Sequence, residues 1–256
     1  ALNSFMMHAT RFVGPALAGW VVAVTGEALC FLLNAASYLA VLLALLAIRL
    51  PASGPRKASA PPLQALREGV RYTAGQRNIR ASLLLIASLS FLATPYTVLM
   101  PLFAREIFGG DARLFGLLMG CAGAGALSGA VLLALRSDTA GLAALIGRVA
   151  PLVGIALALF AVSTSLWLTV PILFGLGLAL LLCVAGSNTL IQTQVDNDFR
   201  GRVMSLFTMA FLGIAPLGSF AVGSLAHVFG VRSTLIACGL LTAAAGLIYR
   251  RSLPTR

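Results

Sequence analysis

The segment 196–202, which reads DNDFRGR, places two acids and two arginines close together between long apolar stretches. A carboxylate is stabilising at a helix N-terminus, so Asp198 could cap a helix that follows it. Arg200 and Arg202 could form ion pairs with a neighbouring loop, and Arg136 and Asp138 are the loop residues we expect to meet them. Alternatively, these charges only fix the side of a membrane on which the segment lies.

Hydroxyl and amide side chains interrupt two of the longest apolar stretches. Ser88, Thr94 and Tyr96 lie in one of them, and Asn188 and Gln192 lie near the end of another. A polar group in an apolar environment is costly unless it is paired or faces water. Two roles therefore remain open for these five residues, which are contact with a substrate along a polar path and hydrogen bonding between helices.

A third pattern combines glycine and proline near the start of the chain. Gly14 and Pro15 are adjacent, and Gly19 follows one helical turn later. Proline removes a backbone donor and kinks a helix, while glycine allows a second helix to approach closely. The pattern predicts either a bendable contact between two helices or ordinary helix packing.

Other kinds of chemistry find no support in the sequence. The seven acids fall in loops or at the ends of apolar stretches, and the four cysteines occur singly, without the spacing of metal ligands or disulfides. The nucleotide-binding pattern G-x-x-x-x-G-K-S/T does not occur. We also find no His-rich motif and no Ser/His/Asp arrangement, so we expect no metal, no cofactor and no enzymatic activity.

The composition is that of a membrane protein. Hydrophobic residues make up 59% of the chain and charged residues 10%, against roughly 25% in soluble domains. Residues 149–195 carry no charge and are too long for one span of about 20 residues, so we divide them at the cluster 163–165. The result is an all-α membrane protein with about eight transmembrane helices, at 2–25, 29–49, 79–104, 114–136, 145–163, 166–194, 202–226 and 232–250.

The net charge of +11 agrees with these spans. Eight spans put both ends of the chain on one side of the membrane. Of the 18 Lys and Arg residues, only Arg105, Arg113 and Arg232 then lie on the other side. Basic residues concentrate on the cytoplasmic side, so we expect both chain ends in the cytoplasm and no role in binding nucleic acid.

The organisation of the chain suggests two halves joined by a linker. Residues 50–78 are the one long polar stretch, and 63–76 have the periodicity of a short basic amphipathic helix on the membrane surface. Ser4 and Ser205 are 201 residues apart, as are Pro15 and Pro216, in spans that cross the membrane in the same direction. A parallel repeat of six spans is the arrangement of the two halves of a major facilitator.

Several longer strings carry a family resemblance. GPALAGWVVAVTG, LQALREGVRY and NTLIQTQVDNDFRGRVMSLFTMAFLGIAPLGS resemble the fifth helix, the linker helix and the tenth and eleventh helices of major facilitator exporters. The likeness is to the enterobactin-exporter-like branch, known as transmembrane secretion effectors, and it covers essentially the whole chain. Gly14, Pro15 and Gly19 resemble the antiporter motif of drug/proton exporters, although Ala18 replaces one of its glycines.

This resemblance implies a division of the chain and a function. Residues 1–49 would be the last two helices of an N-terminal half, 50–78 a cytoplasmic linker and 79–256 a complete C-terminal half, with four helices preceding residue 1. The protein would export a drug or siderophore from a bacterium across the inner membrane by alternating access, coupled to protons. Arg136, Asp138, Asp198, Arg200 and Arg202 would form a cytoplasmic gate. The alternative is a non-transporting scaffold or receptor built on an incomplete facilitator fold.

Overall fold

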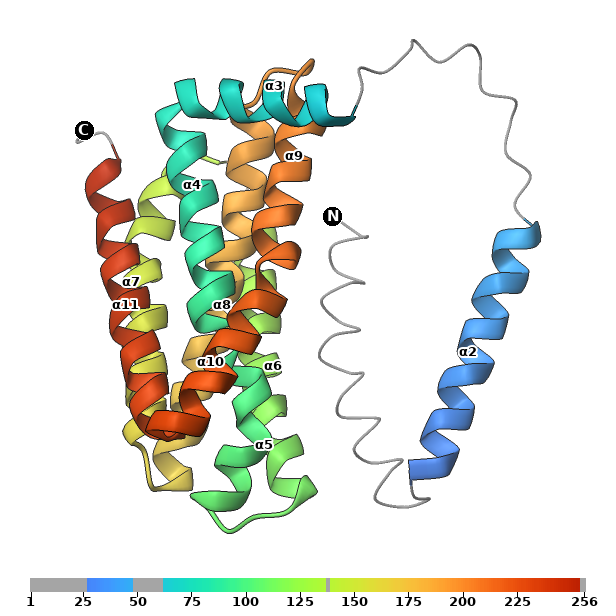
Figure 1. Cartoon of the computed structure of the whole chain (residues 1–256), viewed down its shortest axis with the longest axis vertical. Helices are drawn as coiled ribbons and strands as arrows, with labels where there is room; N and C mark the ends of the chain where they lie inside the picture. Colours follow the sequence, from blue (N-terminus) through green and yellow to red (C-terminus); the bar gives the residue numbers. More distant parts are fainter. Residues whose placement is uncertain (1–26, 48–61, 137–138, 254–256) are drawn as a thin grey trace.

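The computed structural model describes residues 27–47, 62–136 and 139–253, which form α-helices joined by short connections (Figure 1). Within these residues the first two helices are α2 (Glu27–Ala47) and α3 (Pro62–Gly75), and the rest form one bundle. The bundle comprises α4 (Arg77–Ser88), η1 (Leu89–Ala93), α5 (Tyr96–Glu106), α6 (Ala112–Ala134), α7 (Leu142–Val162), α8 (Leu166–Gln194), α9 (Arg200–Thr208), η2 (Met209–Gly213), α10 (Ala215–Phe229) and α11 (Val231–Ser252).

The helices of the bundle confirm six of the predicted spans. Within the described residues, six continuous helical segments are long and apolar enough to cross a membrane, beginning at Arg77, Ala112, Leu142, Leu166, Arg200 and Val231. The division of 149–195 is also confirmed, because α7 ends at Val162 and α8 begins at Leu166. The predicted span 29–49 corresponds to α2, and the predicted span 2–25 lies outside the described residues.

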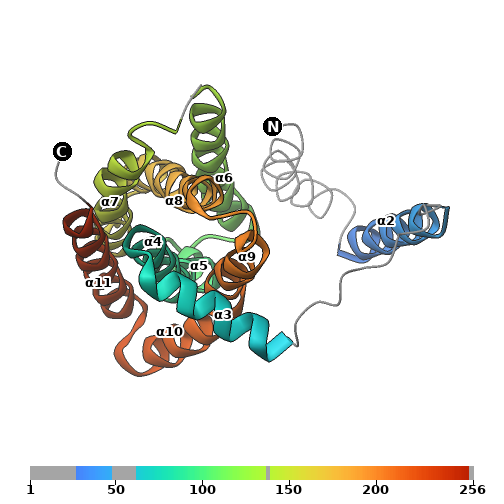
Figure 2. The same cartoon turned by 90° about the horizontal axis from the view of Figure 1, so that it is seen from above.

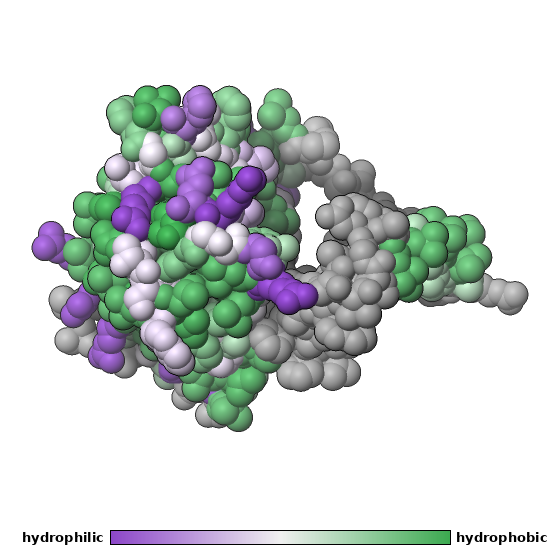
Figure 3. Space-filling model, turned by 90° about the horizontal axis from the view of Figure 1, so that it is seen from below, coloured by the Kyte–Doolittle hydropathy of each residue, from purple (hydrophilic) through white to green (hydrophobic). Residues whose placement is uncertain are grey.

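Consecutive spans run antiparallel, and α3 lies across one end of the bundle (Figure 1). Seen from above, α4 and α5 lie near the centre of the ring that the other helices form (Figure 2). Seen from the end opposite α3, hydrophilic residues interrupt a largely hydrophobic face (Figure 3). Arg105 at the end of α5, Arg113 at the start of α6 and Arg232 at the start of α11 lie at this end, so the predicted separation of basic residues is present among the described residues.

Close contacts between backbones hold the bundle together. A Cβ atom added to Gly125 of α6 would overlap the carbonyl oxygen of Phe174 in α8. One added to Gly177 of α8 would overlap the carbonyl oxygen of Ala122 in α6. Small residues let transmembrane helices pack without intervening side chains, which increases van der Waals contact between them. The two glycines therefore fix the α6–α8 crossing.

Two of the six spans contain a π-helical turn just before a proline. The amide of Thr94 donates to the carbonyl of Leu89 at 2.9 Å, and the amide of Ile214 donates to that of Met209 at 3.1 Å. Pro95 and Pro216 follow these turns, and a widened turn relieves the clash of each proline ring with the carbonyl four residues earlier. Neither π-helical turn was predicted from the sequence, because both lie within continuous apolar stretches.

The two π-helical turns contact each other. The Ser90 hydroxyl in η1, which is fully buried, donates to the carbonyl oxygen of Phe211 in η2. Gly218 in α10 lies directly against the backbone of Phe91, where a side chain would overlap. A π turn displaces carbonyls from the regular ladder, and here a serine of the neighbouring helix satisfies one of them.

Asp111 begins α6 as its N-cap. Its Oδ1 accepts hydrogen bonds from the amides of Arg113 at 3.0 Å and Leu114 at 3.2 Å. We expect Asp111→Ala to lower the free energy of unfolding by about 1 kcal/mol, because two amides lose their acceptor. Thermal unfolding in detergent measures this loss, and Asp111→Asn, which keeps an acceptor oxygen, should unfold close to the wild-type temperature. Equal stability of the alanine variant and the wild type would contradict the role of the cap.

Candidate functional site

Helix α3 is anchored to the α8–α9 connection by Tyr72. The ring of Tyr72 stacks on that of Phe199, with centroids 4.4 Å apart and an angle of 11° between the planes. The Tyr72 hydroxyl donates to Oδ2 of Asp196 at 3.0 Å and accepts from the amide of Asp196 at 3.3 Å. One side chain thus joins α3 to the polar segment 196–202 that the sequence singles out.

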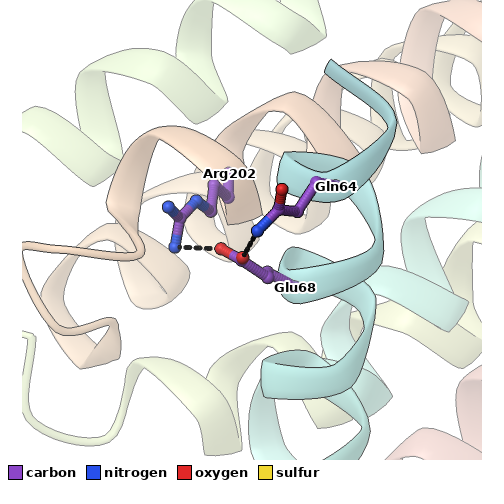
Figure 4. Close-up of polar contacts among 3 residues, drawn as sticks. All are labelled: Gln64, Glu68 and Arg202. Carbon is purple, nitrogen blue, oxygen red and sulfur yellow. Dashed lines mark hydrogen bonds and ion pairs between the residues drawn. The ribbon is translucent and has the colours of Figure 1, made fainter. Parts of the chain in front are cut away.

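Arg202 forms a second contact with α3 (Figure 4). Its Nη1 lies 2.9 Å from Oε2 of Glu68, and the two side chains are 31% and 36% exposed. Gln64 Nε2 donates to the other oxygen of Glu68 at 3.0 Å, which orients the carboxylate. The guanidinium carbon of Arg202 also lies 5.3 Å from the centre of the Phe199 ring, within the range of a cation–π contact.

The face of α3 that makes these contacts follows from helical spacing. Gln64, Glu68 and Tyr72 are four residues apart and so lie on one side of the helix. Gly69 beside them brings the helices together, because a Cβ there would lie 3.2 Å from the Cβ of Arg202. We define the α3 anchor as Gln64, Glu68 and Tyr72 with Asp196, Phe199 and Arg202.

Among these residues, only Arg202 was predicted from the sequence as a gate residue. The signal for Glu68 and Tyr72 was their shared helix face, but nothing in the sequence paired that face with a segment more than 120 residues away. We expected Arg200 and Arg202 to contact the loop that contains Arg136 and Asp138. In the structure Arg202 pairs with Glu68, while Nη2 of Arg136 donates to the carbonyl of Ala140 in its own connection at 2.6 Å.

Two further predicted gate residues, Asp198 and Arg200, lie at the same end of the bundle. Asp198 and Arg200 are exposed, and neither forms an ion pair within the described part of the chain. The N-cap of α9 is Phe199, whose side chain makes no capping bond, so the prediction that Asp198 caps this helix is wrong by one position. Asp138 lies outside the described residues, as do Gly14, Pro15 and Gly19 of the antiporter-like pattern.

The predicted path residues of the first span in the bundle form local hydrogen bonds or pack in the core. The Ser88 hydroxyl donates to the carbonyl of Leu84 at 2.8 Å, and that of Thr94 donates to the carbonyl of Leu89 at 3.2 Å. Tyr96 is 6% exposed, and its ring packs edge-on against Phe160 of α7, with centroids 6.5 Å apart. In this conformation Tyr96 is part of the core between α5 and α7.

The predicted path residues on α8 form one polar pair. Gln192 Nε2 donates to Oδ1 of Asn188, and both lie on one face of the helix, with Gln192 exposed and Asn188 half-buried. The neighbouring Ser187 is fully buried, and its hydroxyl has no hydrogen-bond partner. Among the described residues, no three His, Cys, Asp or Glu side chains lie close enough together to hold a metal ion.

Comparison with known proteins places two transporters among the relatives of this chain. Two relatives are the staphyloferrin A transporter of Staphylococcus aureus, which is 27% identical over 251 residues, and the multidrug efflux pump Tap of Mycobacterium tuberculosis, which is 25% identical over 259 residues. The matches cover 97% and 95% of this chain but 62% and 58% of those proteins. The chain thus spans about three fifths of the length of the curated relatives it matches.

The family assignment covers every residue of the chain. A family model for transmembrane secretion effectors matches residues 1–256. The same match and the six apolar spans identify a multi-pass membrane protein. The chain therefore belongs to the transmembrane secretion effector family of the major facilitator superfamily.

Proposed function

We propose that this chain is part of a secondary active transporter that exports a small molecule of the drug or siderophore class across a bacterial inner membrane. The observation that carries the proposal is the α3 anchor, which holds the helix preceding the six-span bundle across one end of it. The names of the relatives, a siderophore transporter and a multidrug efflux pump, support a small-molecule substrate. Coupling to protons is part of the proposal, and the repeat detected in the sequence supports alternating access.

In this proposal the end that carries α3 faces the cytoplasm. The basic residues concentrated there support this orientation. Residues 1–49 would then belong to the first half of the transporter and 79–256 to the second, with α3 in the linker between them. A contact between the linker and the second half changes when the halves move relative to each other, so the α3 anchor would stabilise the state closed towards the cytoplasm.

The strength of the anchor suits a gate that opens repeatedly. An ion pair as exposed as Arg202–Glu68 contributes about 0–1 kcal/mol, so breaking it is a small step. The aromatic stack of Tyr72 and Phe199 adds about 0.5–1.5 kcal/mol beyond the area it buries. Together these contacts are strong enough to favour one state and weak enough to be broken in each transport cycle.

We expect the double variant Arg200→Ala with Arg202→Ala to lower transport several-fold without reducing the amount of protein in the membrane. The variant removes the Arg202–Glu68 pair and the cation–π contact with Phe199, and so weakens the closed state. Transport is measured as efflux from cells that express the full-length protein, after a panel of dyes, drugs and siderophores has identified one that the wild type exports.

The matched control is Arg250→Ala with Arg251→Ala, which removes the same charge from exposed positions at the same end of the bundle. Full transport by the Arg200/Arg202 variant would exclude the gate. A wild-type protein that exports none of the compounds would instead favour the scaffold or receptor function.

A further inference from the structure

A groove runs along the outside of the bundle between α7 and α11. Its volume is about 260 Å³, and its lining is almost entirely apolar. The floor is made of Gly154, Ala158, Gly239 and Ala243, which carry at most one side-chain carbon each. The walls are larger side chains, among them Leu240.

Tight helix packing creates this groove. Cβ atoms added to Gly154 or Gly239 would overlap the backbone of the opposite helix, so the two backbones touch where they cross. Because no side chains lie between the helices where they cross, the larger side chains on either side leave a groove above the crossing. The walls are exposed, since Leu159 is 48% and Leu240 is 62% exposed, and both would face lipid in a membrane.

A positive charge lies at one end of the groove. Arg232 is four residues before Ile236, which lines the groove, and therefore lies on the same face of α11 one turn closer to the end opposite α3. Its side chain is exposed, and among the described residues it has neither an ion pair nor a hydrogen-bond partner. An unpaired guanidinium at this position is free to bind an anion.

The level of Arg232 corresponds to the membrane–water interface. Trp167, at the start of α8, lies at the same end of the bundle and is 92% exposed. Exposed tryptophans mark the headgroup region of transmembrane proteins. From Ile236 to Ala243 the groove then extends roughly 10 Å into the acyl-chain region, at 1.5 Å per helical residue.

We propose that this groove binds an anionic phospholipid from the leaflet opposite α3, with its phosphate at Arg232 and one acyl chain between α7 and α11. The phosphate is the anion that this leaflet supplies at the depth of Arg232, and Arg binds phosphate with parallel hydrogen bonds. The apolar floor excludes polar ligands and accepts a hydrocarbon chain of this width. This binding site is separate from the α3 anchor and does not depend on the proposed export.

The test uses a tryptophan in the groove and brominated lipids, which quench its fluorescence on contact. In the full chain, with Trp20→Phe and Trp167→Phe, Leu240→Trp reports on the groove. Leu241→Trp is its matched control, because Leu241 is 57% exposed but does not line the groove. Vesicles contain phosphatidylcholine with an equal small fraction of either brominated phosphatidylglycerol or brominated phosphatidylcholine.

We expect brominated phosphatidylglycerol to quench Leu240→Trp with at least a three-fold higher apparent affinity than brominated phosphatidylcholine. Arg232→Gln should abolish this preference, whereas Arg113→Gln, which removes an exposed arginine from the same end of the bundle, should not. Leu241→Trp should show no preference. Equal quenching of Leu240→Trp by the two lipids, or a preference that survives Arg232→Gln, would overturn the proposal.

Discussion

Gly177→Leu should prevent the protein from reaching its folded state. Gly177 of α8 lies against the backbone of Ala122 in α6, and no flexible side chain is available to move aside. A leucine here must separate the two helices along their crossing, which we expect to lower the free energy of unfolding by more than about 4 kcal/mol. The measurement is the yield of monodisperse protein in detergent, followed by its thermal midpoint.

The matched control is two residues away in the same helix. A Cβ on Gly175 would have no neighbouring atom within 4 Å, so Gly175→Leu should give nearly the wild-type yield. Both variants add the same side chain and the same helix propensity, and they differ only in what that side chain meets. Similar yields for the two variants would mean that the α6–α8 contact does not determine folding.

Tyr72→Ala should release α3 from the bundle. The change removes the stack on Phe199 and the two hydrogen bonds between the Tyr72 hydroxyl and Asp196, worth about 1–3 kcal/mol together, which corresponds to roughly a 5- to 150-fold shift towards the released state. Thr73→Cys reports this release, because Thr73 is 7% exposed and its hydroxyl has no partner to lose. The rate of maleimide labelling is measured in a background without the four native cysteines.

Two comparisons separate the parts of this contact. Tyr72→Phe keeps the stack and loses the hydroxyl, so labelling at position 73 should rise by less than it does in Tyr72→Ala, by about ten-fold at most. Ala74 is exposed on α3, so Ala74→Cys should react with maleimide at the same rate whether position 72 is Tyr, Ala or Phe. If the labelling of Thr73→Cys is unchanged by Tyr72→Ala, α3 is held by something other than this anchor.

The sequence predicted the helices well because a membrane imposes a simple rule. A span needs about 20 residues without charge, and charges therefore mark many of the helix boundaries, as Arg77 and Arg200 do where their spans begin. The α7–α8 turn was found because the charge-free stretch was too long for one span. The π turns were missed because Leu89–Ala93 and Met209–Gly213 are as apolar as the helices around them.

The candidate site was predicted less completely, for a different reason. Charge density identified the segment containing Arg202, but the partner of an arginine depends on which elements the fold brings together. Glu68 lies in another polar segment and carries no local signal that distinguishes it from Asp138 as a partner. The sequence also predicted the wrong N-cap for α9. The predicted cap was Asp198, and in the structure the N-cap is the next residue, Phe199.

The paired π turns have a consequence for evolutionary comparison. Each π turn contains one residue more than the α-helical turn it replaces, and this rotates everything downstream by about 100°. The faces of α5 and α10 are therefore out of register with those of α4 and α9, although each pair forms one span. An alignment with a relative that lacks either turn needs a one-residue gap inside the span, and without that gap it would assign the residues facing the interior to the wrong positions.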